Sequence, residues 1–225
     1  MAYSSNLEVV PSTISERMPS TTPAQAPSRH HDWREGLPAL TGSLVTLREL
    51  RPGDAPSLLA SLGTAEVTRL ISPPPPTVDG FEKFIAWTQR QREAGKSVAF
   101  GVVLKGSDTV IGLFQVRALQ PGFEVAEWGF ALGSEFWGKG LFIDASQLVL
   151  DFTFDVIGVH RLEARAALKN GRGNGALQKL GAVQEAVLRG SFLRDGIYHD
   201  QGFWTILSDA WREKRASRGI VRIVH

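Results

Sequence analysis

Residues 123–151 read FEVAEWGFALGSEFWGKGLFIDASQLVLD, and this stretch decides the fold. Residues 125–132 are rich in apolar and aromatic side chains, which indicates a strand. From Leu141 to Val156 the apolar residues recur at helical spacing, which predicts a helix from 140 to about 157. Three glycines, at 133, 138 and 140, separate the two segments. The stretch is therefore a strand that enters a helix through a glycine-rich turn.

Such a turn suits an anion. The first N–H groups of a helix have no partner inside the helix, and the helix dipole adds partial positive charge there. Glycine allows a phosphate to approach the backbone closely. We therefore expect the N–H groups from Trp137 to Phe142 to bind a phosphate or a diphosphate.

Composition narrows the class of protein. The chain has 225 residues, enough for one domain with a tail, and 43% of them are hydrophobic and 21% charged, as in soluble globular proteins. The net charge is +2 with dispersed Lys and Arg, so we expect no nucleic-acid partner. The absence of cysteine excludes disulfides, thiolate metal sites and a cysteine nucleophile. No apolar run approaches the roughly 20 residues that span a bilayer, and no secretory signal is present, so we expect a cytoplasmic protein without a membrane partner.

Domain boundaries follow from periodicity. Residues 1–40 are rich in Ser, Thr and Pro and predict a flexible tail, in which His30 and His31 fit a solvated pair better than a metal site. Trp33 and Leu37 are candidates to dock on the domain edge. The domain itself is expected at 41–216, followed by a C-terminal tail at 217–225.

Within the domain, strands and helices alternate in a way that predicts an α+β fold with a mixed sheet. Asp54 is a candidate N-cap, and Thr77 caps a helix that follows the four prolines at 73–76. We read these prolines as a stiff connector in preference to a docking ligand for a partner. The helix between strands 125–132 and 161–167 predicts that these two strands lie parallel and adjacent. The expected strands are 44–50, 97–104, 109–117, 125–132, 161–167, 183–192 and 196–207, and the remaining helix is 170–180.

Three interpretations of the glycine turn stay open on these patterns alone. Residues 133–139 match the phosphate loop G-x-x-x-x-G-K, but Gly140 replaces the hydroxyl that would hold Mg²⁺. Antiparallel strands also precede the turn, whereas a phosphate loop follows a parallel array. The second interpretation is a glycine cluster without a ligand. The third rests on a resemblance.

Four motifs, in the same order, resemble the GNAT superfamily of acetyltransferases. Residues 137–140 (WGKG), after a strand that carries Glu127, resemble its coenzyme A turn. Residues 158–164 (GVHRLEA) resemble a strand of the RimJ/RimL-like branch, which acetylates the N-termini of ribosomal proteins. Asn170 with residues 177–181 (LQKLG) resembles the next helix of that branch, and residues 193–200 resemble its closing hairpin. The resemblance spans roughly residues 44–207.

The resemblance implies the GNAT fold, with about seven strands, about four flanking helices and a fourth and fifth strand that splay apart. It implies acetyl-CoA as the cofactor, with the pantetheine arm on the backbone of Phe130 and Leu132 and an oxyanion-stabilising N–H near Leu132. A splayed strand would need a bulge, and Gly129 is the expected place. Asn170 fits a cofactor contact or a helix N-cap about equally. The cofactor-binding residues it implies are Phe130, Leu132, Trp137, Gly138, Lys139, Gly140, Leu141, Phe142, Asn170 and Gly173.

The expected reaction is acetyl transfer to a primary amine by direct attack in a ternary complex, since the chain has no cysteine. A protein or peptide N-terminus is the first choice of acceptor, because an α-amine has a pKa of about 8 and a Lys amine one of about 10.4. Glu127 is the expected base, ahead of five other residues. The acceptor pocket is expected between residues 72–78 and the closing hairpin, and a homodimer is left open. The five weaker candidates are Glu124, His160, Asp195, His199 and Asp200, of which His160 fits core or cap packing better.

Two alternatives remain. One is a small-molecule amine acceptor such as an aminoglycoside or a polyamine. The other is an acyl-CoA-binding module without turnover, because several positions depart from the family pattern. Leu177 stands where many relatives have a Tyr acid, Gly173 where the branch often has Ser, and Phe192 where some have Glu. Phe142 and Ile143 replace the usual small residues after the turn.

Overall fold

The computed structural model describes residues 32–69 and 71–220. Their strands form one sheet in the order β1-β2-β3-β4-β5-β6-β8-β7. The β5–β6 pair is parallel and every other pair is antiparallel, which confirms the predicted crossover. The strands are β1 (Leu40–Thr41), β2 (Val45–Glu49), β3 (Ser97–Leu104), β4 (Val110–Ala118), β5 (Val125–Leu132), β6 (Arg161–Ala167), β7 (Val183–Arg194) and β8 (Ile197–Leu207). The two-residue β1 is the strand beyond the expected seven.

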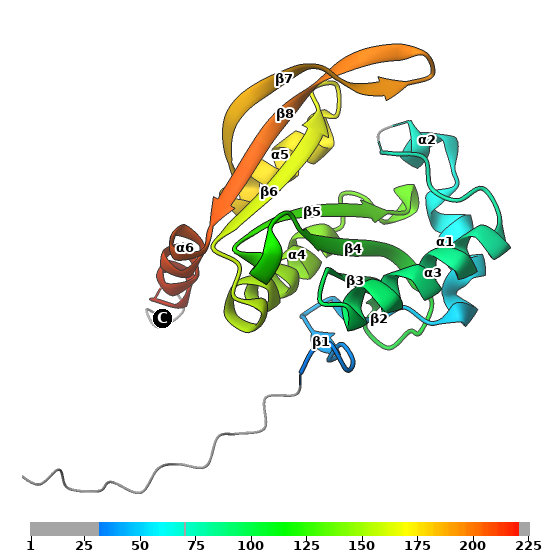
Figure 1. Cartoon of the computed structure of the whole chain (residues 1–225), viewed down its shortest axis with the longest axis horizontal. Coiled ribbons are helices and arrows are strands. Elements are labelled where there is room, and N and C mark those ends of the chain that lie inside the picture. The colour runs from blue at the N-terminus through cyan, green and yellow to red at the C-terminus, as the bar shows by residue number, and fades with distance from the viewer. Residues whose placement is uncertain (1–31, 70, 221–225) are drawn as a thin grey trace, which may run out of the picture. The chain divides into compact units, whose positions relative to one another are not determined.

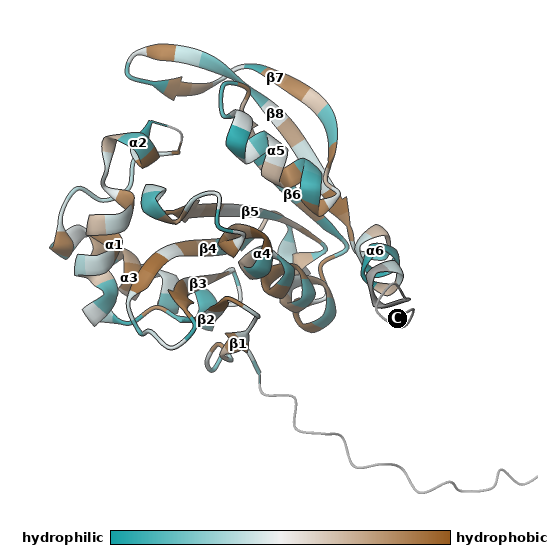
Figure 2. Ribbon diagram, turned by 180° about the vertical axis from the view of Figure 1, so that it is seen from behind, coloured by the Kyte–Doolittle hydropathy of each residue, from teal (hydrophilic) through white to brown (hydrophobic). Residues whose placement is uncertain are grey.

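Helices cover the sheet on both faces (Figures 1 and 2). The α-helices are α1 (Ala55–Leu62), α2 (Ala65–Thr68), α3 (Val78–Glu93), α4 (Leu141–Asp151), α5 (Gly171–Leu180) and α6 (Ser208–Ile220). Helices α1 and α3 pack on one face through Leu58 and Ile85. Helix α4 packs on the other face through Val149, and α5 lies on that same face through Leu177. None of the described helices is both long and apolar enough to cross a bilayer.

The structure confirms the predicted start of α3 and the predicted end of the helix that follows β5. The Thr77 hydroxyl accepts the Gly80 N–H at 3.0 Å and starts α3. Gly158, at φ +87°, ends the long helix that begins with α4. The last six residues of that helix, Phe152–Ile157 (η4), form a π-helix, which the sequence pattern did not predict. The described residues also include three short 3₁₀ turns: η1 (Pro52–Asp54), η2 (Pro121–Phe123) and η3 (Ser134–Phe136).

The packed domain includes residues before the predicted start at Thr41. Trp33 is only 5% exposed, and its ring meets Phe123 edge-on with centroids 5.6 Å apart. Leu37 also packs against the main core, so the predicted docking of these two residues is confirmed. The rest of the predicted tail, residues 1–31 with His30 and His31, lies outside the described residues.

The C-terminal boundary also differs from the prediction. Helix α6 continues to Ile220, so the expected boundary after residue 216 falls inside a helix. Its arginines hold it against the end of the long helix, since Arg215 pairs with Asp151 at 2.8 Å and with Asp155 at 2.6 Å. Residues 221–225 lie outside the described part.

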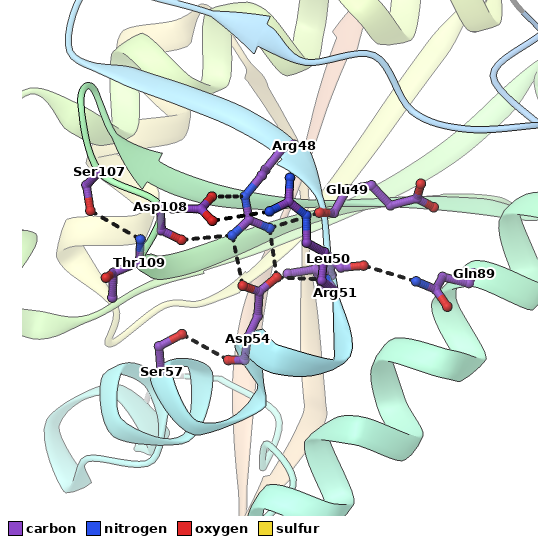
Figure 3. Close-up of polar contacts among 10 residues, drawn as sticks. All are labelled: Arg48, Glu49, Leu50, Arg51, Asp54, Ser57, Gln89, Ser107, Asp108 and Thr109. Atoms are coloured by element: carbon purple, nitrogen blue, oxygen red, sulfur yellow. Dashed lines mark hydrogen bonds and ion pairs between the residues drawn. The ribbon is translucent and has the colours of Figure 1, made fainter.

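A buried ion pair fastens the entry to α1 (Figure 3). Arg48 donates two hydrogen bonds to the Asp54 carboxylate, both 2.8 Å long, and a third to Asp108 at 2.8 Å. Asp54 also accepts the Arg51 N–H at 2.7 Å. The sequence predicted that its side chain would cap α1, but it makes no such hydrogen bond. Burial alone would raise the pKa of Asp54, but these hydrogen bonds outweigh burial and lower it. The pair therefore joins β2, η1 and the β3–β4 turn.

A second cluster joins the outer strands. Arg161 donates to Glu185 at 2.9 and 2.7 Å and to Glu163 at 2.9 Å, and the Thr205 hydroxyl donates to Glu185 at 2.7 Å. The hydrogen bonds from Arg161, and then from Thr205, lower the pKa of Glu185 to about 2. The carboxylate thus stays ionised well into the acid range and ties β7 to β6 and β8.

This cluster predicts a change in acid stability. Because the folded-state pKa of Glu185 is below its ordinary 4.5, its stabilisation is complete above pH 4.5 and is lost as the pH falls toward 2. We expect the urea midpoint of Glu185→Gln to fall less steeply with decreasing pH than that of the parent protein between pH 4.5 and 2. The effect should be small and should shrink in high salt, since the Glu185 side chain is 40% exposed. Glu82→Gln, on the exposed face of α3, should leave the slope unchanged; equal slopes in all three proteins would contradict the prediction.

Candidate functional site

Strands β5 and β6 form a fork. They pair only at Val125–Arg161, Ala126–Leu162 and Glu127–Glu163, although β5 continues to Leu132 and β6 to Ala167. Beyond Glu127 the two strands diverge, as Figure 1 shows. The predicted splay is therefore confirmed, and it begins directly after Glu127.

The expected bulge at Gly129 is wrong. The β4–β5 ladder runs without a register shift from Ala118–Ala126 to Gly112–Leu132 and passes through Gln115–Gly129. Strand β6 instead keeps all seven of its residues paired with β8. The fork therefore arises because β6 follows β8 away from β5, while β5 stays regular against β4.

The ladder fixes which backbone groups face the gap. Gly133 N–H donates to Ile111 and Leu119 N–H donates to Val125, both at 2.9 Å. In an antiparallel ladder the residues that bond the partner alternate, so the N–H and C=O of Phe130 point away from β4, toward the gap. Leu132 has the same orientation, but its C=O accepts the Trp137 indole N–H at 2.9 Å. Phe130 thus presents both backbone groups to the gap, and Leu132 presents its N–H.

The glycine turn presents a set of N–H groups. Gly138 and Gly140 have φ of +76° and +79°, a conformation that glycine adopts without strain. Among the described residues, no protein group accepts a hydrogen bond from the N–H groups of residues 138–142. Trp137 is the exception to the prediction, because its N–H donates to Ser134 at 3.2 Å. Five adjacent amides at the start of α4 therefore remain available to an anion.

The turn forms one wall of a first cleft of about 520 Å³ between the end of β5, α4 and α5. Its charged side chains are basic: Lys179, and Arg172, whose guanidinium lies 4.5 Å from the Trp137 ring centroid. The predicted cofactor residues on its walls are Phe130, Leu132, Trp137, Gly138, Gly140, Phe142, Asn170 and Gly173. Lys139 and Leu141 do not line it, and the Leu141 side chain is in the core. The cleft can accept a diphosphate.

Asn170 has the N-cap role that the sequence left open. Its side-chain oxygen accepts the Gly173 N–H at 2.8 Å and starts α5. A Cβ on Gly173 would lie 2.6 Å from the Asn170 amide nitrogen, so a larger residue there would require the Asn170 side chain to shift. Both residues line the first cleft and also the second one.

A second cleft, of about 750 Å³, lies beside the fork and shares Phe130, Ala131, Asn170, Gly173 and Ile71 with the first. The prolines at 73–76 form part of its wall, and so does Phe192 of the closing hairpin. A pocket therefore lies between these two segments, where the sequence predicted the acceptor pocket. Its polar side chains are Ser72, Gln115, Arg165, Asn170 and Gln201.

Neither cleft has an obvious acid or base. None of the described residues that line them is Asp, Glu, His or Tyr. Glu127 lies next to the second cleft, with its side chain 20% exposed. Its Oε2 accepts a short hydrogen bond from Arg117, and its Oε1 lies 3.7 Å from Arg165. Glu127 is therefore the last paired residue before the fork and adjoins a residue of the cleft wall.

The weaker base candidates lie outside the cleft walls. Asp200 accepts the Gly190 N–H at 2.8 Å, and the Asp195 side chain is 79% exposed in the hairpin turn. His199 faces Phe192 with ring centroids 6.4 Å apart. His160 is exposed, which contradicts the core alternative of its predicted core or cap packing. Leu177, at the position of the usual Tyr acid, is buried at 1% exposure.

Sequence reasoning missed Arg165, Gln115, Gln201 and Arg172. Arg165 stood on the polar face of the strand 161–167, and the fork identifies it as the first residue of that face beyond the paired region. The two glutamines come from β4 and β8, 86 positions apart in the sequence, and no local pattern joins them.

Known proteins share this architecture. Residues 45–183 match the family model described as an acetyltransferase (GNAT) domain. The chain is 30% identical over 135 residues to the "Probable N-acetyltransferase YjcK" of Bacillus subtilis, covering 59% of this chain and 74% of the relative. It is 22% identical over 137 residues to the [ribosomal protein uS5]-alanine N-acetyltransferase of Escherichia coli, covering 60% and 71%.

Solved structures with similar folds agree. Mycobacterium smegmatis RimJ in complex with CoA-disulfide superposes with a TM-score of 0.71 at 18% identity, covering 80% of this chain and 94% of that one. A GCN5-related N-acetyltransferase from Brucella melitensis gives a TM-score of 0.66 at 22% identity, covering 78% and 80%. At these identities the two structures show a common fold.

Proposed function

Because the chain belongs to the GNAT family of acetyltransferases, and is thus an acetyl-CoA-dependent N-acetyltransferase, we propose that its acceptor is the α-amine of a protein or peptide N-terminus. The relative named for the alanine of ribosomal protein uS5 supports this choice at 22% identity. Support from the molecule itself comes from the two clefts that adjoin at the fork, one for each substrate.

The first cleft suits acetyl-CoA. The free N–H groups of residues 138–142 and the basic side chains of Arg172 and Lys179 would hold the diphosphate, and the backbone of Phe130 would hold the pantetheine arm. When bound, acetyl-CoA supplies an acetyl group activated as a thioester. The open ladder position of Phe130, which both clefts share, would bring donor and acceptor to the same edge of β5.

One observation carries the choice of an α-amine: the cleft walls hold no Asp, Glu, His or Tyr among the described residues. Only a neutral amine attacks a carbonyl. At pH 7.5 roughly a quarter of α-amines are neutral, against about one in a thousand Lys amines. A site with so few proton acceptors therefore suits the amine that already carries fewer protons.

Glu127 is the proposed base, acting through a water at the fork. Within the described part of the chain, its Oε1 accepts no hydrogen bond and lies 3.7 Å from Arg165, whereas its Oε2 is held by Arg117. This arrangement orients the carboxylate and leaves one oxygen for a water that reaches the acceptor cleft. The chain offers no Tyr at Leu177 for the departing thiolate, so its proton would come from solvent.

We expect Glu127→Gln to lower kcat by about 10²-fold, which is a typical contribution of a positioned general base to the rate. The affinity for acetyl-CoA should change less than about twofold. Steady-state kinetics and calorimetry measure the two quantities. Glu163→Gln is the matched control, because Glu163 lies opposite Glu127 in the ladder but pairs with Arg161. An unchanged kcat in Glu127→Gln removes Glu127 from this role.

The acceptor class is tested by free-thiol release from acetyl-CoA with a panel of peptides, aminoglycosides and polyamines. We expect release with peptides that have a free N-terminus and none with the same peptides blocked at that end. Release with small amines alone would overturn the proposal. Mass spectrometry of the products, which separates α-acetylation from Lys acetylation, decides which amine reacts.

A further inference from the structure

We infer that Arg165 selects acceptors that carry a carboxylate close to the reactive amine, in the first instance peptides with an acidic residue just after the N-terminal one. This inference rests on the proposed function, since it takes the second cleft as the acceptor site. It assigns to that site a charge preference that the family assignment does not contain.

Arg165 occupies the fork itself. It lies on β6 two residues beyond Glu163, the last residue of β6 that pairs with β5. It shares the strand face of Arg161 and Glu163, opposite the buried Leu162 and Ala164. Its side chain is 45% exposed and forms part of the second cleft, the only arginine on either cleft's described wall besides Arg172 in the first. A ligand in the second cleft would therefore lie beside Arg165.

The carboxylates of this face accept their hydrogen bonds from other arginines. Glu127 accepts a short hydrogen bond from Arg117, and Glu163 and Glu185 accept from Arg161 at 2.9 and 2.7 Å. Arg165 also forms an ion pair with Glu127, but its Nη1 lies 3.7 Å from Oε1, beyond hydrogen-bonding distance. No hydrogen bond joins Arg165 to another residue in the described part of the chain. Most of its five N–H donors are therefore available to a bound molecule.

A guanidinium with open donors in a partly enclosed cleft favours a carboxylate, which it can bind with two parallel hydrogen bonds. The remaining walls match a peptide. Gln115 and Gln201 can bond main-chain amides, and the partly buried Phe84 and Phe192 form apolar surface for a side chain. Arg165 would repel a basic residue at the same place. The acceptor class that fits these walls is an α-amine followed by an acidic residue.

The test uses matched peptides that differ only at the second or third residue, which is Glu, Gln or Lys, with acetyl-CoA and the full chain. We expect kcat/KM to be at least tenfold higher for Glu than for Gln at one of these positions, because the Glu peptide has the lower KM. Calorimetric binding of the same peptides to the enzyme loaded with coenzyme A should show the same ratio. Free glutamate and alanine form a separate arm, in which turnover would identify an α-carboxylate as the group that Arg165 binds.

Variants make the assignment specific. Arg165→Gln should bring the Glu and Gln peptides within twofold of each other, and Arg165→Glu should favour the Lys peptide. Arg189→Gln is the control: it removes an exposed guanidinium of the closing hairpin that lies outside both cleft walls, so the preference for Glu should persist. Thermal melts check folding, and if Arg165→Glu unfolds, Arg165→Gln alone decides.

The outcomes separate the two claims. Turnover of α-amines with equal rates for Glu and Gln peptides in the parent protein overturns the role of Arg165 and leaves the proposed function intact. A Glu preference that survives in Arg165→Gln also overturns it. Failure of every α-amine, with turnover of other amines, overturns the proposed function itself.

Discussion

Replacing Gly138 with Asp is expected to weaken acetyl-CoA binding by roughly 10³-fold. Gly138 lines the first cleft, and a Cβ built on it meets no atom within 4 Å, so an aspartate would fit but would project into the anion site. A carboxylate about 4 Å from a diphosphate charge costs about 4 kcal/mol at an effective dielectric of 20. That energy corresponds to about a thousandfold in the dissociation constant, which calorimetry with acetyl-CoA measures.

The matched control is Gly106→Asp in the β3–β4 turn. Gly106 has φ of +82°, close to the +76° of Gly138, and a Cβ on it also meets nothing within 4 Å. Both variants therefore carry the same backbone strain of about 1–2 kcal/mol, but only one places charge in the cleft. We expect Gly106→Asp to bind acetyl-CoA normally. Equal affinities for the two variants would show that the turn does not hold the diphosphate.

Local physics explains what the sequence could predict. Glycines with positive φ, at positions such as 140, 158 and 181, end or begin helices because other residues are strained there. The change from strand to helical spacing at Leu141 is likewise local, and so are the caps at Thr77 and Asn170. These signals gave the element order, and the element order gave the parallel crossover, whereas the fork was expected only from the family resemblance.

Features that depend on distant partners escaped prediction. Gly129 looked like a bulge, but the fork depends on β6 pairing with β8. Asp54 stands at a helix start, but its side chain binds Arg48 on the preceding strand β2, whose guanidinium also reaches Asp108 in the β3–β4 turn. The second cleft draws its walls from α3, β4, β5, β6 and the hairpin, so its polar residues could be named only once these elements were placed.

The second large effect concerns stability. We expect Arg48→Met to lower the free energy of unfolding by about 3–5 kcal/mol, because it leaves the Asp54 carboxylate buried without its guanidinium. Both side chains are 9% exposed, so water cannot replace the lost partner. For a domain of this size that loss lowers Tm by roughly 6–20 °C. Urea unfolding at pH 7 measures the free energy, and calorimetric scanning measures Tm.

Two further variants show that burial, and not charge as such, sets this cost. Arg51 also pairs with Asp108, but the two side chains are 62% and 72% exposed, so Arg51→Met should cost at most about 1 kcal/mol. The double variant Arg48→Met/Asp54→Leu removes both buried charges and should regain most of the loss, since apolar residues of similar volume satisfy a buried site without ionic partners. If Arg48→Met cost no more than Arg51→Met, water would have to reach Asp54, and the entry to α1 would be far more open than its packing indicates.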